Sequence, residues 1–156
     1  MSGIGPEPMM GLYAQQAAIQ AAARALVALL PPGTDRIEYQ GVYVIPHIAQ
    51  VFFVYTPDGR KFQIPGSWDV TTPFAELRRV MYTPGKGTWF SLTMTVSASG
   101  PVQTAFNYSN EPPDLPGTGP ATRSYLADLQ WYPIDEDIRP DWLKQRIAAE
   151  LAAVPH

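Results

Sequence analysis

Two neighbouring stretches of this chain, residues 90–97 and 102–108, alternate between apolar and polar side chains at every second position. This pattern is typical of antiparallel strands that cover a core with one face and meet solvent with the other. It predicts a hairpin around Gly100 whose apolar side chains are buried. The apolar positions are Phe90, Leu92, Met94, Val96, Val102 and Phe106. The positions expected on the solvated face of the first strand are Ser91, Thr93, Thr95 and Ser97.

The rest of the chain contains further helix and strand patterns. Apolar side chains at helical spacing, Ile19 and Leu26 among them, predict a long helix over residues 9–30 with Ile19 in the core. It ends before Pro31 because proline cannot donate the next backbone hydrogen bond. Strands are also predicted at residues 37–45, 50–56 and 61–64. Further helices are predicted at residues 72–82, with Thr72 as N-cap, at 122–131, and from Pro140 to 153.

This order of elements predicts an α+β fold. Runs of strands flanked by helices, in place of strict alternation, favour an antiparallel sheet of four to five strands. The long N-terminal helix is expected to pack on one face of the sheet, and two helices follow at the C-terminal end. No linker is long enough to divide the 156 residues, which predicts a single domain over residues 1–156.

Composition and charge narrow the classes of function. The chain has no cysteine, which excludes a disulfide framework and cysteine-bound zinc. Its net charge of −3 argues against nucleic acid as the partner, because phosphate binding needs clustered Lys and Arg, and suits a basic protein partner. Polar residues interrupt the run at 9–30 and the first 23 residues lack Lys and Arg, so neither a membrane span nor a signal peptide is predicted. The expected location is the cytoplasm, and the oligomeric state, monomer or dimer, stays open.

Sequence motifs of the common enzyme classes are absent, including HExxH, GxSxG and GxGxxG. The stretch PGKGT, residues 84–88, leads into a strand, whereas a phosphate loop leads into a helix whose N-terminus binds the anion. It is therefore predicted to be a turn. His47 has no acid or nucleophile near it in the sequence, and a general base needs an orienting partner, so His47 is also predicted to be a turn residue. No cofactor is expected.

The segment YPIDEDIRPDWL, residues 132–143, holds four carboxylates within seven positions. A calcium loop places oxygen ligands at alternate positions and then a glycine. The chain has Arg139 at the third ligand position and Pro140 at the glycine position, so no metal site is predicted.

The dipole of the following helix offers a structural explanation for part of this acidity. It accounts for Asp141 in the first turn and partly for Asp137. Asp135 and Glu136 are left as surplus charge on a loop beside aromatic residues. They fit either a charged surface that holds a protein partner or a pair of catalytic carboxylates.

Residues 87–147 contain three motifs, TWFSLTMTVSASGPVQTAFNYSNEPP, YLADLQWYP and IRPDWLKQRI. Together with VFFVYTPDGRKF upstream, they resemble the YezG-like immunity proteins of bacterial polymorphic toxin systems. The matching landmarks are Trp89 at the start of a strand, Gly100 in a hairpin, Phe106-x-Tyr108 at the end of the next strand, and the acid Glu111. The family often has an aspartate directly after Phe-x-Tyr, where this chain has Ser109-Asn110.

The resemblance implies a cytoplasmic, non-enzymatic antidote that binds a cognate secreted toxin, typically a nuclease, and blocks its active site. Loops 109–120 and 132–139 join acidic and aromatic side chains, which suit contact with a basic protein surface. The predicted partner-binding residues are Tyr108, Glu111, Asp114, Tyr132, Asp135, Glu136 and Asp137. Alternatively, the aromatic residues, above all Trp131 and Trp142, belong to the core and the acids only solvate the surface. The alternative function is a small α+β enzyme with an unrecognised carboxylate site.

Overall fold

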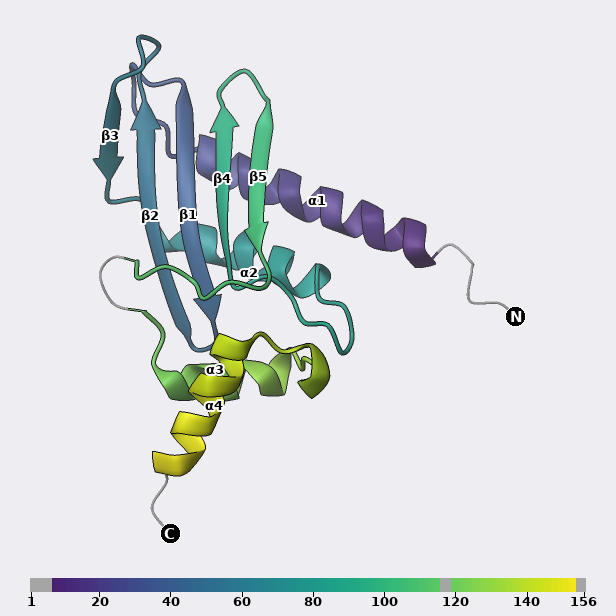
Figure 1. Ribbon diagram of the computed structural model, residues 1–156. Helices are drawn as coiled ribbons and strands as arrows, with labels where there is room; N and C mark the ends of the chain where they lie inside the picture. The colour runs from purple at the N-terminus through teal and green to yellow at the C-terminus, as the bar shows by residue number, and fades with distance from the viewer. Residues whose placement is uncertain (1–6, 116–118, 154–156) are drawn as a thin grey trace.

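A five-stranded antiparallel sheet forms the centre of the protein, with helices on both of its faces (Figure 1). The computed structural model describes residues 7–115 and 119–153. The strands are β1 (Arg36–Val44), β2 (His47–Tyr55), β3 (Lys61–Ile64), β4 (Ser91–Ser97) and β5 (Val102–Asn107), in the order β3-β2-β1-β4-β5. The helices are α1 (Glu7–Val27), α2 (Thr71–Val80), α3 (Thr122–Trp131) and α4 (Asp141–Ala153), with short 3-10 turns η1 (Trp68–Val70) and η2 (Glu136–Ile138). The predicted α+β fold is confirmed.

Helices α1 and α2 cover one face of the sheet. Alanines on α1 leave room for the helix to lie close to the strands. Leu26 of the same helix has no exposed surface and belongs to the core cluster on this face. Phe74 of α2 stacks on Tyr39 of β1 with ring centroids 4.2 Å apart. This face holds the larger core cluster, which also includes Ile37, Phe52, Leu77, Trp89, Leu92, Met94 and Val96. Among the described residues, no helix is long and apolar enough to cross a membrane.

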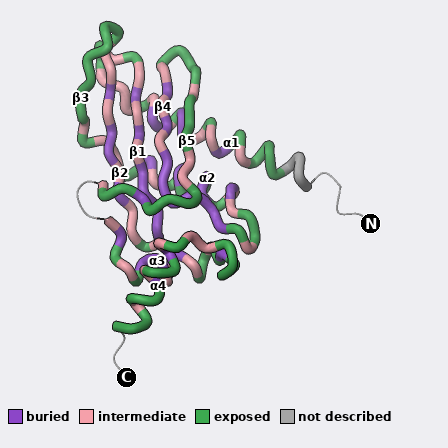
Figure 2. Tube along the Cα trace, in the orientation of Figure 1, coloured by how far each residue is buried: buried purple, intermediate pink, exposed green. Residues whose placement is uncertain are grey.

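Helices α3 and α4 cover the opposite face only near the β1–β2 turn (Figures 1 and 2). There they enclose a second cluster, made of Val42, Val44, Ala49, Phe90, Tyr125, Ile134, Leu143 and Ile147. Towards the other end of the strands this face carries half-buried polar side chains such as Gln40, Thr93 and Thr95. At the end away from the β1–β2 turn, helices therefore cover only one face of the sheet, and the other face is open.

Burial differs from the alternating pattern at both ends of the hairpin. Phe90 is buried as predicted, but it precedes β4 and packs in the second cluster, opposite to Leu92. Ser91 is buried as well, where Asn107 donates to its hydroxyl at 3.0 Å. Val102, Phe106 and Ile19 are only half-buried against the core, although they were predicted to be buried. The reason for the first two is that β5 is an edge strand, so that neighbours cover it on one side only.

Two predicted element ends are wrong for local reasons. Thr72 is not an N-cap, because η1 runs directly into α2 and the N-cap position is Val70, without a side-chain hydrogen bond. Ser67 supplies the cap instead, by accepting from the Asp69 N–H at 3.1 Å. His47 is the first residue of β2, not part of the turn before it.

Candidate partner-binding surface

A buried ion pair joins α2 to α3 beneath the acidic segment. The Arg78 guanidinium donates from Nη1 and Nη2 to the two carboxylate oxygens of Asp128, at 2.5 and 2.8 Å. Its Nε donates to the Trp89 carbonyl at 2.7 Å, and Asp128 also accepts from the Ile45 N–H at 3.0 Å. Both side chains are almost fully buried, so the pair is stable only because these further hydrogen bonds satisfy it. It holds four separate segments in one arrangement.

Aromatic and backbone contacts extend this arrangement to residues 132–138, the acidic strap. The Tyr132 ring lies 4.9 Å from the Arg78 guanidinium and 5.4 Å from the Tyr82 ring. Tyr82 donates its hydroxyl to the Pro133 carbonyl at 3.2 Å, and the Asp135 N–H donates to the Gly85 carbonyl at 2.7 Å. The strap is therefore fixed along its first half. Burial raises the pKa of the Tyr132 phenol further above neutral pH.

The carboxylates of the acidic strap face solvent. Asp135, Glu136 and Asp137 are all exposed, and in the described part of the chain none of them forms an ion pair. Ile138 is half exposed next to them, and Trp131 keeps 68% of its surface exposed. Trp131 is therefore not a core residue. Unpaired acids beside exposed large apolar side chains are what a surface for a basic and partly apolar partner requires.

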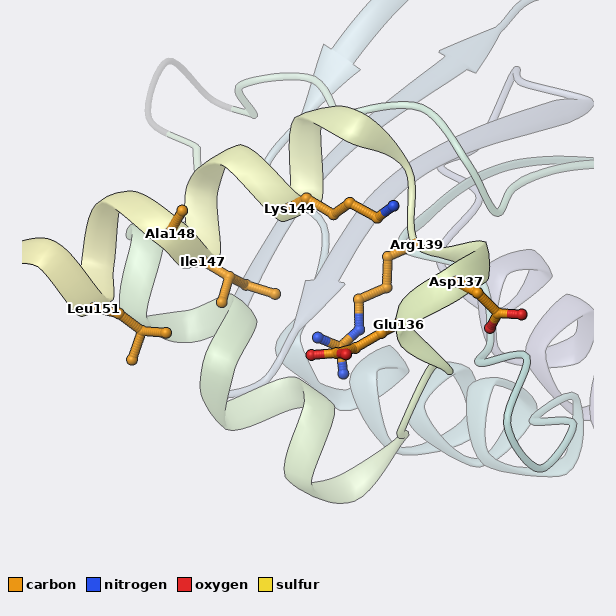
Figure 3. A pocket seen from close by; sticks show the side chains of 7 residues that line it. All are labelled: Glu136, Asp137, Arg139, Lys144, Ile147, Ala148 and Leu151. Carbon is orange, nitrogen blue, oxygen red and sulfur yellow. The ribbon is translucent and has the colours of Figure 1, made fainter.

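A groove of about 520 Å³ lies between the acidic strap and α4 (Figure 3). Its apolar wall consists of Ile147, Ala148 and Leu151, which follow one another along α4. Its charged end carries acids and cations, namely Glu136, Asp137, Arg139 and Lys144. Arg139 is held there because its Nε donates to the Ile134 carbonyl at 2.8 Å. The groove can therefore take an apolar side chain and an ionic group together.

The other predicted contact residues lie on a separate segment. The segment at 109–111 is tied to α4, because Trp142 donates its Nε1–H to the Ser109 carbonyl at 2.7 Å and Arg146 bonds the Glu111 carboxylate. This hydrogen bond raises the pKa of the Arg146 guanidinium. Glu111 is thus neutralised within the chain, unlike the acids of the strap. Asp114 is exposed, and Tyr108 keeps 47% of its surface exposed.

His47 lines a smaller hollow of about 280 Å³ together with Arg78 and Tyr132. Its Nε2 has no hydrogen-bond partner among the described residues, and burial lowers the pKa of the imidazole. A catalytic histidine would need a carboxylate to orient it. The buried carboxylate nearby, Asp128, already bonds Arg78 through both oxygens. In the described ranges no group of three His, Cys, Asp or Glu side chains could hold a metal ion.

The buried pair and the groove were missed in the sequence, although part of their signal is visible there. Arg78 follows Phe74 by four positions, so helical spacing places it on the inward stripe of α2. Asp128 follows the buried Tyr125 by three positions in the same way. A charged residue on an inward stripe indicates a buried partner, but spacing does not show which residue that partner is. The groove depends on how α4 meets the strap, which the sequence pattern does not show.

Comparison with known proteins adds no family to this picture. No protein-family model matches the chain, and no curated protein matches it significantly. The resemblance to YezG-like immunity proteins is therefore a prediction that rests on the sequence motifs.

Proposed function

We propose that this protein is an immunity protein that binds a secreted bacterial toxin and blocks its active site by occlusion. The observation that carries the proposal is the acidic strap, with three exposed carboxylates that form no ion pair within the described chain. Such charges speed encounter with a basic surface and exclude wrong partners. A toxin that acts on nucleic acid has a basic active-site face, which is the surface that these acids would cover.

The neighbouring groove supports the same function. Tight interfaces need an apolar centre as well as a charged rim. Ile147 and Leu151 supply apolar surface beside the strap, and Leu151 keeps 59% of its surface exposed. The contacts from Tyr82 and Gly85 hold the strap in place before binding, which lowers the entropy cost of association.

The alternative function, a small enzyme with a carboxylate site, has weaker support. The strap carboxylates are exposed, and no described histidine or serine nucleophile bonds to them. The buried carboxylate of Asp128 is fully engaged by Arg78. No observation in the described chain favours a reaction over binding.

Charge reversal on the strap tests the proposal. The variant carries Asp135→Lys, Glu136→Lys and Asp137→Lys together, all at exposed positions where folding should be unaffected. We expect its association rate constant with a cognate toxin to fall by about tenfold or more at low salt. Cells that co-express this toxin should also lose protection. Stopped-flow fluorescence and survival after toxin induction measure the two effects.

A matched control separates the position of the charges from their sum. Asp35→Lys, Asp58→Lys and Asp69→Lys change the net charge equally at exposed sites away from the strap, where surface ion pairs contribute little to stability. This control should bind and protect almost as well as the native chain. Glu111 is left unchanged in both, because its reversal would also break the bond to Arg146. If the strap variant and the control bind equally well, the toxin docks elsewhere, and the open sheet face becomes the first candidate.

A further inference from the structure

Strand β5 presents an unprotected edge of the sheet. The bond from the Ser97 N–H to the Pro101 carbonyl and the register of β4 with β5 direct the backbone groups of Gln103 and Ala105 towards β4. The N–H and C=O groups of Val102, Thr104 and Phe106 therefore point outward, and they have no backbone partner among the described residues. Proteins usually protect such an edge with charge, proline or a short strand. The six residues of β5 contain no charge and no proline.

The other edge of the sheet is protected in the usual way. Strand β3 has only four residues, and it begins with Lys61, whose charge disfavours the approach of another strand. The chain thus leaves one of its two sheet edges available and closes the other. An assembly through β5 would therefore stop at two copies and would not continue into a fibre.

Helix α1 extends beyond this edge (Figure 1). From Gly11 onward, the first side chain of α1 in the core is Ala18, whereas residues 11–17, which we call the α1 ledge, are exposed except for the half-buried Gln15. Leu12 and Tyr13 keep 68% and 69% of their surfaces exposed on this ledge. Exposed helical turns without packing contacts are only marginally stable in water. The ledge therefore lacks the layer that would normally lie against it.

Both surfaces are free of charge. No Asp, Glu, Lys or Arg occurs in residues 8–23, which include the α1 ledge, or in residues 87–110, which include β4 and β5. A solvated helix face normally carries charged residues, so an uncharged one indicates a surface that another protein covers. An uncharged surface offers nothing to attract a basic toxin. It also causes no like-charge repulsion when it meets a second copy of itself.

We infer that the occupant of this edge is a second copy of the chain, paired antiparallel through β5. One register lets the outward backbone groups of Val102, Thr104 and Phe106 all form hydrogen bonds with the second copy. It places Thr104 opposite the second Thr104, and Val102 opposite Phe106. The two sheets then form one continuous sheet, and each α1 ledge extends towards the other copy. Gly11, Ala14 and Ala17 are small enough for the two helices to approach closely. This dimer is independent of the proposed toxin binding and leaves the acidic strap free.

Two substitutions at Thr104 test the dimer. Thr104 is exposed, and its outward N–H takes no part in the β4 ladder, so the protomer should still fold. Thr104→Lys places two ammonium groups face to face, and we expect the dimer to be lost and the mass to fall to that of one protomer. Thr104→Cys should form a disulfide across the twofold axis. The Cα atoms of directly opposed, hydrogen-bonded residues lie about 5.5 Å apart, which is within the Cα–Cα range of disulfides. Since the chain has no other cysteine, the product is unambiguous.

Sedimentation velocity and non-reducing electrophoresis give the readouts, with Ser99→Cys as the control. Ser99 is exposed in the β4–β5 turn, off the proposed axis, and should crosslink far less. A native chain with the mass of one protomer at every concentration would overturn the dimer. So would a dimer that Thr104→Lys leaves intact. If the native chain is a monomer but Thr104→Lys abolishes toxin binding, the edge receives a strand of the toxin, and the second copy is the wrong occupant.

Discussion

The pair of Arg78 and Asp128 shows how one interaction fixes a surface that it does not itself form. Its atoms are inside the protein, yet it aligns the second half of α3, the β1–β2 turn and the ring of Tyr132. Removing one member leaves an uncompensated buried charge, which costs more than the pair gains as a whole. A stable fold therefore needs either both charged side chains or neither of them.

Substitution of one member should be strongly destabilising. We expect Asp128→Ala to lower the free energy of unfolding by about 3–5 kcal/mol. The double variant Arg78→Met, Asp128→Leu should recover a large part of this loss, because it leaves no buried charge. Urea unfolding followed by tryptophan fluorescence measures all three proteins. Equal losses in the single and double variants would show that the charge pair itself, and not the unpaired charge, determines the effect.

The turn at residues 83–87 is the element that supports the acidic strap. The sequence prediction of a turn at PGKGT agrees with the structure, where Thr83 and Gly87 form a bridge and Lys86 pairs with Ile134. Gly87 has φ +86°, and a Cβ there would lie 2.7 Å from Cγ1 of Ile134. The lack of a side chain at Gly87 is therefore what allows the strap to lie against the turn.

A comparison of two glycines separates this contact from backbone strain. Gly59 has φ +90° with open space around it, so Gly59→Ala should cost only the left-handed strain of about 1–2 kcal/mol. Gly87→Ala should cost more, because it also displaces Ile134 from the second core cluster. We further expect weaker toxin binding for Gly87→Ala alone. Thermal unfolding and titration calorimetry check both effects, and equal losses of stability would contradict the contact with Ile134.

At the scale of elements, the sequence pattern predicted most of the architecture. The alternation at 92–96 and the helical spacing in α2 and α3 arise from local geometry, so they are readable without the structure. Half-burial of Val102 and Phe106 follows instead from the position of β5 at the sheet edge. Strand order is a property of the whole fold, and periodicity does not report it.

The candidate site was predictable to a smaller extent. The sequence analysis left Asp135 and Glu136 as surplus charge, and the structure leaves both exposed and unpaired within its described part. Glu111 was predicted to be part of the same acidic surface, but Arg146, 35 positions away, neutralises it. A long-range ion pair of this kind leaves no local pattern. The same reason explains why Arg78 and Asp128 were missed.

Across the whole molecule, the charged acidic strap and the uncharged edge of the sheet lie in two separate regions. The acids of the acidic strap lie at the end covered by α3 and α4, whereas β5 and the α1 ledge are uncharged. Under the two proposals, one region meets a basic partner while the other meets a second copy. Binding at the strap should then be sensitive to salt, because ions screen exposed charges.

Titration of toxin activity tests the proposed function most directly. Increasing amounts of the purified protein are added to a constant amount of the candidate cognate toxin, and the remaining toxin activity is measured. If the protein acts by occlusion, activity should fall linearly to zero at a fixed molar ratio and return when the complex is separated. Full toxin activity in the presence of excess protein, or irreversible loss at ratios far below one protomer per toxin, would contradict an immunity protein that works by binding.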